Sequence, residues 1–161
     1  IRSAAYEGML EHGLPGRDLI DHHVAMAKGS VALTTVSYGA VSAAGRTFNT
    51  QMFINEQSLA KLGVLAEEVH AAGAKVSMQL THCGYFSKNR DIRRPLAPSR
   101  VFNAYGFLSG IAFSRAMSGE DMQRIAGDFA RAASRLWRNR SKLPRRMLKL
   151  PRPPSSRQRP R

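Results

Sequence analysis

Four residues with reactive or hydrogen-bonding side chains lie close together near the middle of this 161-residue sequence: Gln79, His82, Cys83 and Tyr85. They offer an amide that both donates and accepts hydrogen bonds, a titratable imidazole, a thiol and a phenol. A side-chain amide can hydrogen-bond the polar edge of a heterocycle, which suits a flavin or a purine ring. From spacing alone, we weigh a ligand site and ordinary polar loop residues equally.

The elements that position this cluster follow an alternating α/β pattern. Apolar residues on one helical face predict a helix that Asp18 caps and Gly29 ends, and the β-rich run 31–36 predicts a buried strand. A second helix is predicted over 56–72, and a second strand over 75–80. Strand, helix and strand in this order indicate parallel strands joined by a right-handed crossover.

The ends of these strands are where a ligand is expected. Parallel α/β sheets and barrels bind ligands at the carboxyl ends of their strands. The residues that follow the expected strands are 3–7, 37–38 and 79–85, and the last group is the richest in polar side chains. The connection over 81–116 is long, so it is expected to be functional or to contain small extra elements. A helix capped by Ser118 is predicted after it.

The charge of the sequence divides it into two parts. The chain has a formal charge of +14; residues 1–134 hold 14 basic and all 11 acidic residues, and residues 135–161 hold 11 basic residues and no acidic ones. Five of the eight prolines also lie in the second part. We predict a domain over 1–134 and a disordered Arg/Pro-rich tail over 135–161. This composition is typical of GC-rich coding read out of frame, so we interpret the tail as a frameshift or a mis-joined exon.

Several classes of protein are disfavoured by composition. No apolar run approaches the roughly 18 residues of a membrane span, so no membrane partner is expected. Cys83, the single cysteine, excludes an internal disulfide and a Cys-pair zinc site. It suits a reducing compartment, and we expect a cytoplasmic protein. The histidines lack metal-ligand spacing, so no metal site is assigned.

Six short blocks occur in an order and spacing that match one known family. They are Ser3–Gly8, Ala32–Tyr38, Val41–Arg46, Glu68–Ala74, Met78–Gly84 and Ala97–Ser99. Together they resemble the N-terminal half of the old yellow enzyme-like NADH:flavin oxidoreductases. The resemblance implies an α/β fold, the N-terminal half of a (β/α)8 TIM barrel over 1–134. It also implies an FMN flavoprotein, an oxidoreductase that passes hydride from NAD(P)H to an activated alkene or a similar small-molecule acceptor.

The resemblance further implies which residues bind the cofactor. These positions are Ser3, Ala4, Ala5, Tyr6, Tyr38 and Gln79. The first four would form a loop under the flavin, and the backbone of Tyr38 would contact its pyrimidine side. Gln79 would hydrogen-bond the polar edge of the ring, while His82 would either brace the loop or touch the substrate.

The sequence departs from the family pattern in two places. Ala4 and Ala5 stand where many members have proline and a larger residue, which leaves the substrate open. The histidine pair that grips the substrate carbonyl would lie beyond Ser134, so no catalytic residue is assigned. We therefore expect a truncated chain that is inactive alone, with open barrel edges that favour self-association.

An alternative function rests on the tail. A run of arginines binds polyanions such as nucleic acids electrostatically, with an affinity that falls steeply with salt. Residues 135–161 contain one aromatic residue, Trp137, and no known nucleic-acid-binding module, which disfavours a nucleic-acid partner.

Overall fold

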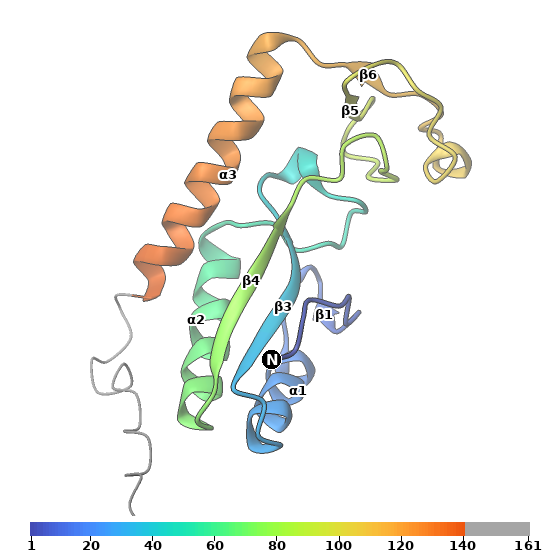
Figure 1. Cartoon of the computed structure of the whole chain (residues 1–161). Helices are drawn as coiled ribbons and strands as arrows, with labels where there is room; N and C mark the ends of the chain where they lie inside the picture. The colour runs from blue at the N-terminus through green and yellow to red at the C-terminus, as the bar shows by residue number, and fades with distance from the viewer. Residues whose placement is uncertain (141–161) are drawn as a thin grey trace, which may run out of the picture.

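Two parallel strands, β3 (Leu33–Ala40) and β4 (Lys75–Thr81), form the centre of the structure (Figure 1). The structure is a computed structural model that describes residues 1–140. The strand register pairs Leu33 with Lys75 and Ala40 with Thr81. On the other edge of β3, the backbone N–H of Arg2 donates to the carbonyl of Leu33 at 2.8 Å. The first residues of the chain therefore run beside β3, which has neighbours on both edges.

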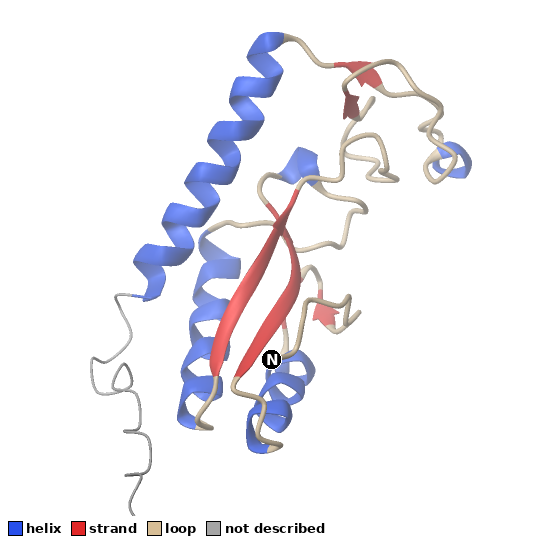
Figure 2. Ribbon diagram, in the orientation of Figure 1, coloured by secondary structure: helices blue, strands red, loops and turns tan. Residues whose placement is uncertain are grey.

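Three helices pack around this strand pair (Figure 2): α1 (Arg17–Lys28), α2 (Glu56–Ala71) and α3 (Gly119–Arg140). Helix α1 contacts β3, and α2 packs against both α1 and β4. Helix α3 lies against α2 and β4. The core between these elements is aliphatic and includes Leu19, Val36, Leu62, Leu65 and Val69. The two helices and two strands predicted before residue 81 are therefore confirmed, with small shifts at their ends.

The two faces of β4 differ because successive side chains of a strand point in opposite directions. Val76, Met78 and Leu80 pack against the core on the helix side. Lys75, Ser77 and Gln79 alternate with them and are exposed on the other face. The strand thus separates an apolar layer from a polar, accessible face.

The beginnings of α2 and α3 are held by side-chain caps. The side chain of Asn55 accepts from the backbone of Ser58 at 2.8 Å, and the Ser58 hydroxyl accepts from the backbone of Asn55 at 2.9 Å. At α3, the Ser118 hydroxyl accepts from the backbone of Asp121 at 3.1 Å, which confirms the predicted cap. Asp18 is not the cap of α1, because the helix begins at Arg17 and Gly16 takes the cap position. Its carboxylate lies in the first turn, where it favours the positive end of the helix dipole.

Short elements complete the described chain. A hairpin of β1 (Leu10–Glu11) and β2 (Leu14–Pro15) precedes α1, and a 3-10 turn, η1 (Ala43–Gly45), follows β3. The connection after β4 contains β5 (Leu96–Ala97), η2 (Phe107–Ser109) and β6 (Arg115–Ala116). This long connection therefore contains small extra elements, as predicted. Within residues 1–140, no helix combines the length and hydropathy that a membrane span needs.

Helix α3 continues past Ser134, the position where the sequence suggests a boundary. The side-chain amide of Asn139 donates to the carbonyl of Leu59 at 2.8 Å and ties the last turn of α3 to α2. Residues 135–140 are thus helical, and the remainder of the predicted tail, 141–161, lies outside the described residues.

Candidate functional site

The polar face of the strand pair is organised by two hydrogen bonds between the strands. The hydroxyls of Thr35 and Ser77 lie 2.7 Å apart, and the Ser37 hydroxyl donates to the side-chain oxygen of Gln79 at 3.2 Å. Because β3 and β4 are parallel, Ser37 and Gln79 both lie toward the carboxyl ends of their strands. The Gln79 oxygen is occupied by Ser37, so the amide NH2 group remains the donor for a ligand on this exposed face.

Three aromatic rings contact one another around Tyr6, which belongs to the expected flavin loop. The ring of Tyr6 lies 5.7 Å from that of Tyr38 and 5.9 Å from that of Phe48. Tyr6 is exposed and Tyr38 is half-buried. Thus the structure brings Tyr6 and Tyr38, two of the residues suggested from the sequence, into direct contact.

The other residues of the expected flavin loop have little side chain to contribute. Ser3 and Ala5 are exposed, and Ala4 is half-buried. None of the three makes a side-chain hydrogen bond to another described residue, so any role in binding would come from their backbone groups and from the shape of the loop.

A buried charged network, missed by sequence reasoning, holds this loop at both ends. The guanidinium of Arg2 donates to a carboxylate oxygen of Glu7 at 2.7 Å and to the carbonyl of Thr35 at 3.1 Å. The backbone N–H of Ser37 donates to the other oxygen of Glu7 at 3.3 Å. The side chain of Glu7 is 2% exposed. Arg2 and Glu7 therefore anchor residues 3–6 to β3, next to the serine that orients Gln79.

A fully buried histidine lies beneath the same network. Nδ1 of His23 is 2.7 Å from the hydroxyl of Thr34, and its Nε2 is 3.6 Å from Glu7, beyond hydrogen-bonding distance. Burial, with a contribution from the charge of Arg2, lowers the pKa of His23 to about 4. The apolar stripe of α1 signals this position, since His23 shares a helical face with Leu19, Ile20 and Ala27.

His82 and Cys83 make contacts within the protein that support the loop. The backbone N–H of Gly84 donates to Nδ1 of His82 at 3.1 Å. His82 also packs closely on Gly45, where an added Cβ would lie 2.8 Å from the imidazole. The thiol of Cys83 donates to the carbonyl of Arg46 at 3.1 Å. Burial lowers the pKa of His82 and raises the pKa of Cys83.

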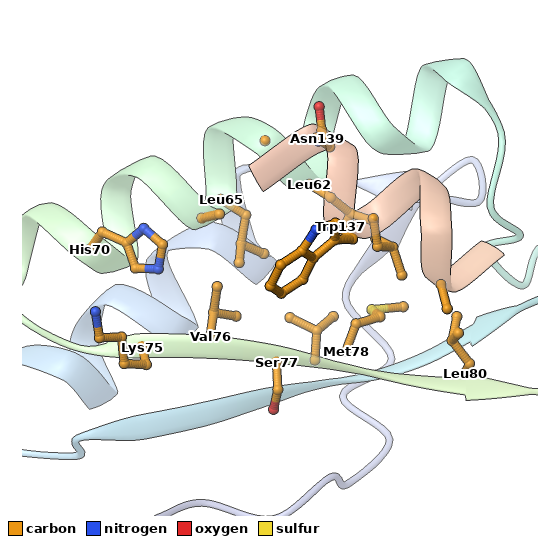
Figure 3. A pocket seen from close by; sticks show the side chains of 15 residues that line it. Leu62, Leu65, His70, Lys75, Val76, Ser77, Met78, Leu80, Trp137 and Asn139 are labelled. Atoms are coloured by element: carbon orange, nitrogen blue, oxygen red, sulfur yellow. The ribbon is translucent and has the colours of Figure 1, made fainter. Parts of the chain in front are cut away.

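A large cleft lies on the opposite side of β4. It has a volume of about 530 Å³ and runs between α2, β4 and α3. Figure 3 shows Trp137 of α3 pointing into it between Leu65 and Met78, while Ser77 points away. Its lining is mainly aliphatic and lies across the strand from the polar face. This cleft is therefore separate from the group around Gln79.

The described residues offer no metal centre. No group of three or more His, Cys, Asp or Glu side chains within residues 1–140 is arranged to hold a metal ion. The polar groups of the site are an amide, two phenols and backbone groups, which suit a planar polar heterocycle.

A family model described as the NADH:flavin oxidoreductase / NADH oxidase family matches residues 5–138. Among curated proteins, 4,4'-dithiodibutanoate disulfide reductase of Rhodococcus erythropolis is 32% identical over 136 residues. That alignment covers 83% of this chain and 32% of the relative.

Solved structures show the same fold. Morphinone reductase in complex with tetrahydroNAD matches with a TM-score of 0.72 and 22% identity, over 86% of this chain and 42% of that chain. An old yellow enzyme homologue from Zymomonas mobilis matches with a TM-score of 0.70 and 19% identity, over 86% of this chain and 41% of that chain. The fold predicted from the sequence, part of a (β/α)8 barrel, is therefore confirmed. The chain spans less than half the length of these relatives.

Proposed function

Because this chain belongs to the NADH:flavin oxidoreductase / NADH oxidase family, we propose that it forms the FMN-contacting part of a NAD(P)H-dependent oxidoreductase. When bound, FMN would supply the hydride transfer from NAD(P)H to an activated alkene or a similar acceptor. The observation that carries the proposal is the hydrogen bond from Ser37 to Gln79. It holds an exposed amide in the carboxyl-terminal half of β4, and the paired strand β3 carries Tyr38, whose ring contacts that of Tyr6.

The residues at this edge fit a flavin ring. The NH2 group of Gln79 would donate to an acceptor on the polar edge of the ring, because its oxygen already accepts from Ser37. The backbone of Tyr38 and the loop of Ser3, Ala4, Ala5 and Tyr6 would contact the ring from below. His82 would support the adjacent loop through Gly84 and Gly45.

Flavin binding by the full chain tests this proposal. Titration of FMN should quench its fluorescence on binding, and Gln79→Ala should weaken the affinity about tenfold, the effect of one well-formed hydrogen bond to a ligand. Gln57→Ala is the matched control, since Gln57 is exposed on α2. Absence of FMN binding by the wild-type chain, or equal affinities for the two variants, would contradict the proposal.

Catalytic oxidation of NADPH requires more of the chain than FMN binding does. The resemblance assigns the substrate-anchoring histidine pair to a strand after residue 134, and the chain spans about 42% of morphinone reductase. We therefore propose that this chain alone holds FMN without oxidising NADPH catalytically. Steady consumption of NADPH by the purified, flavin-loaded chain would refute this.

The free edge of β4 is the basis for a proposal of self-association. Among the described residues, β4 pairs only with β3, so its other edge presents unpaired backbone groups. Such edges favour pairing with another strand. Analytical ultracentrifugation would detect the resulting dimers or larger species.

Polyanion binding through residues 135–161 remains the alternative function. Within the described part of this segment, α3 presents Arg135 and Arg138 on an exposed helical surface. The discriminating measurement is RNA binding at increasing salt with and without the segment, because loss of a selected binding element would remove the salt-dependent affinity.

A further inference from the structure

A second group of polar residues lies in the connection between β4 and α3. Arg93, Arg94 and Arg115 line a pocket of about 480 Å³, with Ile92 as its apolar wall. Figure 1 places β6, which contains Arg115, and its partner β5 beyond the carboxyl end of β4. The pocket is therefore at the same end of the molecule as Gln79, and none of its residues belongs to the flavin-contacting set.

The backbone on either side of the pocket is fixed by parallel pairing. Strand β5 pairs with β6, and Leu96 is opposite Arg115. The backbone N–H of Arg115 donates to the carbonyl of Pro95 at 2.8 Å, and that of Met117 donates to Ala97 at 2.8 Å. Pairing thus holds Arg94, which directly precedes Pro95, near Arg115, although 20 residues separate these positions in the sequence.

The pocket carries an excess of positive charge. Arg115 makes an ion pair with Asp121 at 2.9 Å, but Asp121 also pairs with Arg124 at 2.6 Å. One carboxylate therefore serves two guanidinium groups. Arg93 and Arg94 are exposed and form no ion pair within residues 1–140. Three guanidinium groups in one pocket repel each other, and a bound anion would relieve that repulsion.

The chemistry of the lining indicates the class of anion. Guanidinium groups present planar sets of N–H donors that match phosphate oxygens in bidentate fashion. Several arginines in one pocket suit adjacent phosphates better than a single carboxylate, and Ile92 offers apolar contact to a ribose. We propose that this pocket binds the diphosphate of the nicotinamide dinucleotide, an assignment that rests on the proposed function because that function supplies the dinucleotide.

Phosphate chemistry alone is tested first, with inorganic pyrophosphate as the probe. Calorimetric titration of the full chain at low salt is expected to show binding, and Arg93→Gln/Arg94→Gln should weaken it about tenfold. The matched control is Lys28→Gln/Lys61→Gln, which removes the same number of positive charges from exposed positions on α1 and α2. The control should stay within about twofold of the wild type. Equal weakening in the two variants would overturn the site, because it would mean a response to overall charge.

Nucleotide probes then identify the source of the phosphate. NAD⁺ and FMN are titrated separately into the wild type and into Arg93→Gln/Arg94→Gln. Weaker NAD⁺ binding with unchanged FMN binding supports the proposal, whereas weaker FMN binding with unchanged NAD⁺ binding overturns it in favour of the flavin phosphate. If FMN binds neither protein, while pyrophosphate still binds Arg93→Gln/Arg94→Gln more weakly than the wild type, the proposed function fails and the phosphate site stands. If FMN binds, but pyrophosphate binds the wild type and Arg93→Gln/Arg94→Gln equally well, the phosphate site is refuted and the proposed function is not.

Discussion

Replacing Glu7 with glutamine is expected to lower the free energy of unfolding by about 3 kcal/mol, because it breaks a buried ion pair by removing one partner. Both carboxylate oxygens of Glu7 are used: one accepts from Arg2 and the other from the backbone N–H of Ser37. A glutamine turns one of these acceptors into a donor, which must then face another donor. The guanidinium of Arg2 would lose its charged partner in a site where little water can replace it.

Urea unfolding at neutral pH measures this loss. Glu67→Gln, at an exposed position on α2, is the matched control and should change stability by less than about 0.5 kcal/mol. The double variant Arg2→Met/Glu7→Gln should recover part of the loss, since it also removes the unpaired charge. A Glu7→Gln variant as stable as the control would show that the network does not stabilise the fold.

Acidification is expected to destabilise the protein through His23, by about 3 kcal/mol between pH 6.5 and pH 4. Burial lowers the pKa of His23 from its ordinary 6.5 to about 4 in the folded state. Between these values the unfolded chain binds a proton that the folded chain does not. The contribution of neutral His23 to stability is therefore complete above pH 6.5 and is lost as the pH falls toward 4.

Unfolding midpoints in urea at a series of pH values isolate this effect. His23→Asn removes the titrating group, so its stability should fall less steeply across this range than that of the wild type. His12→Asn makes the same substitution at an exposed histidine and should keep the wild-type slope. Identical slopes for wild type and His23→Asn would contradict the assignment.

The gathering of Gln79 and Tyr38 at one edge could be predicted from the sequence. Both residues lie in the carboxyl-terminal halves of strands that are joined by a well-patterned helix, and parallel strands place these halves together. The network of Arg2 and Glu7 could not be predicted in the same way. These residues meet because the loop between them folds against β3, and no periodicity describes such a loop.

Two further features could not be predicted from the sequence: the pocket of arginines and the continuation of α3 past Ser134. Arg94 and Arg115 are brought together by strands of two residues each, which are too short to show an alternating pattern. The run of charge after Ser134 suggests a boundary there, but arginine is a good helix former and α3 continues to Arg140. The contact from Asn139 to Leu59 holds that turn on α2, and a tertiary contact of this kind has no local signature.

The paired hydroxyls and amide of the polar face have a thermodynamic consequence for any ligand. Thr35 bonds to Ser77 and Ser37 bonds to Gln79, so the polar side chains of this face, including the amide that would meet a ring, are already held by protein partners. Most of their rotational freedom is lost when the chain folds, not when the ligand arrives. Preorganisation of this kind reduces the entropy cost of association, so affinity would depend chiefly on the fit of the ligand to donors that are already in place.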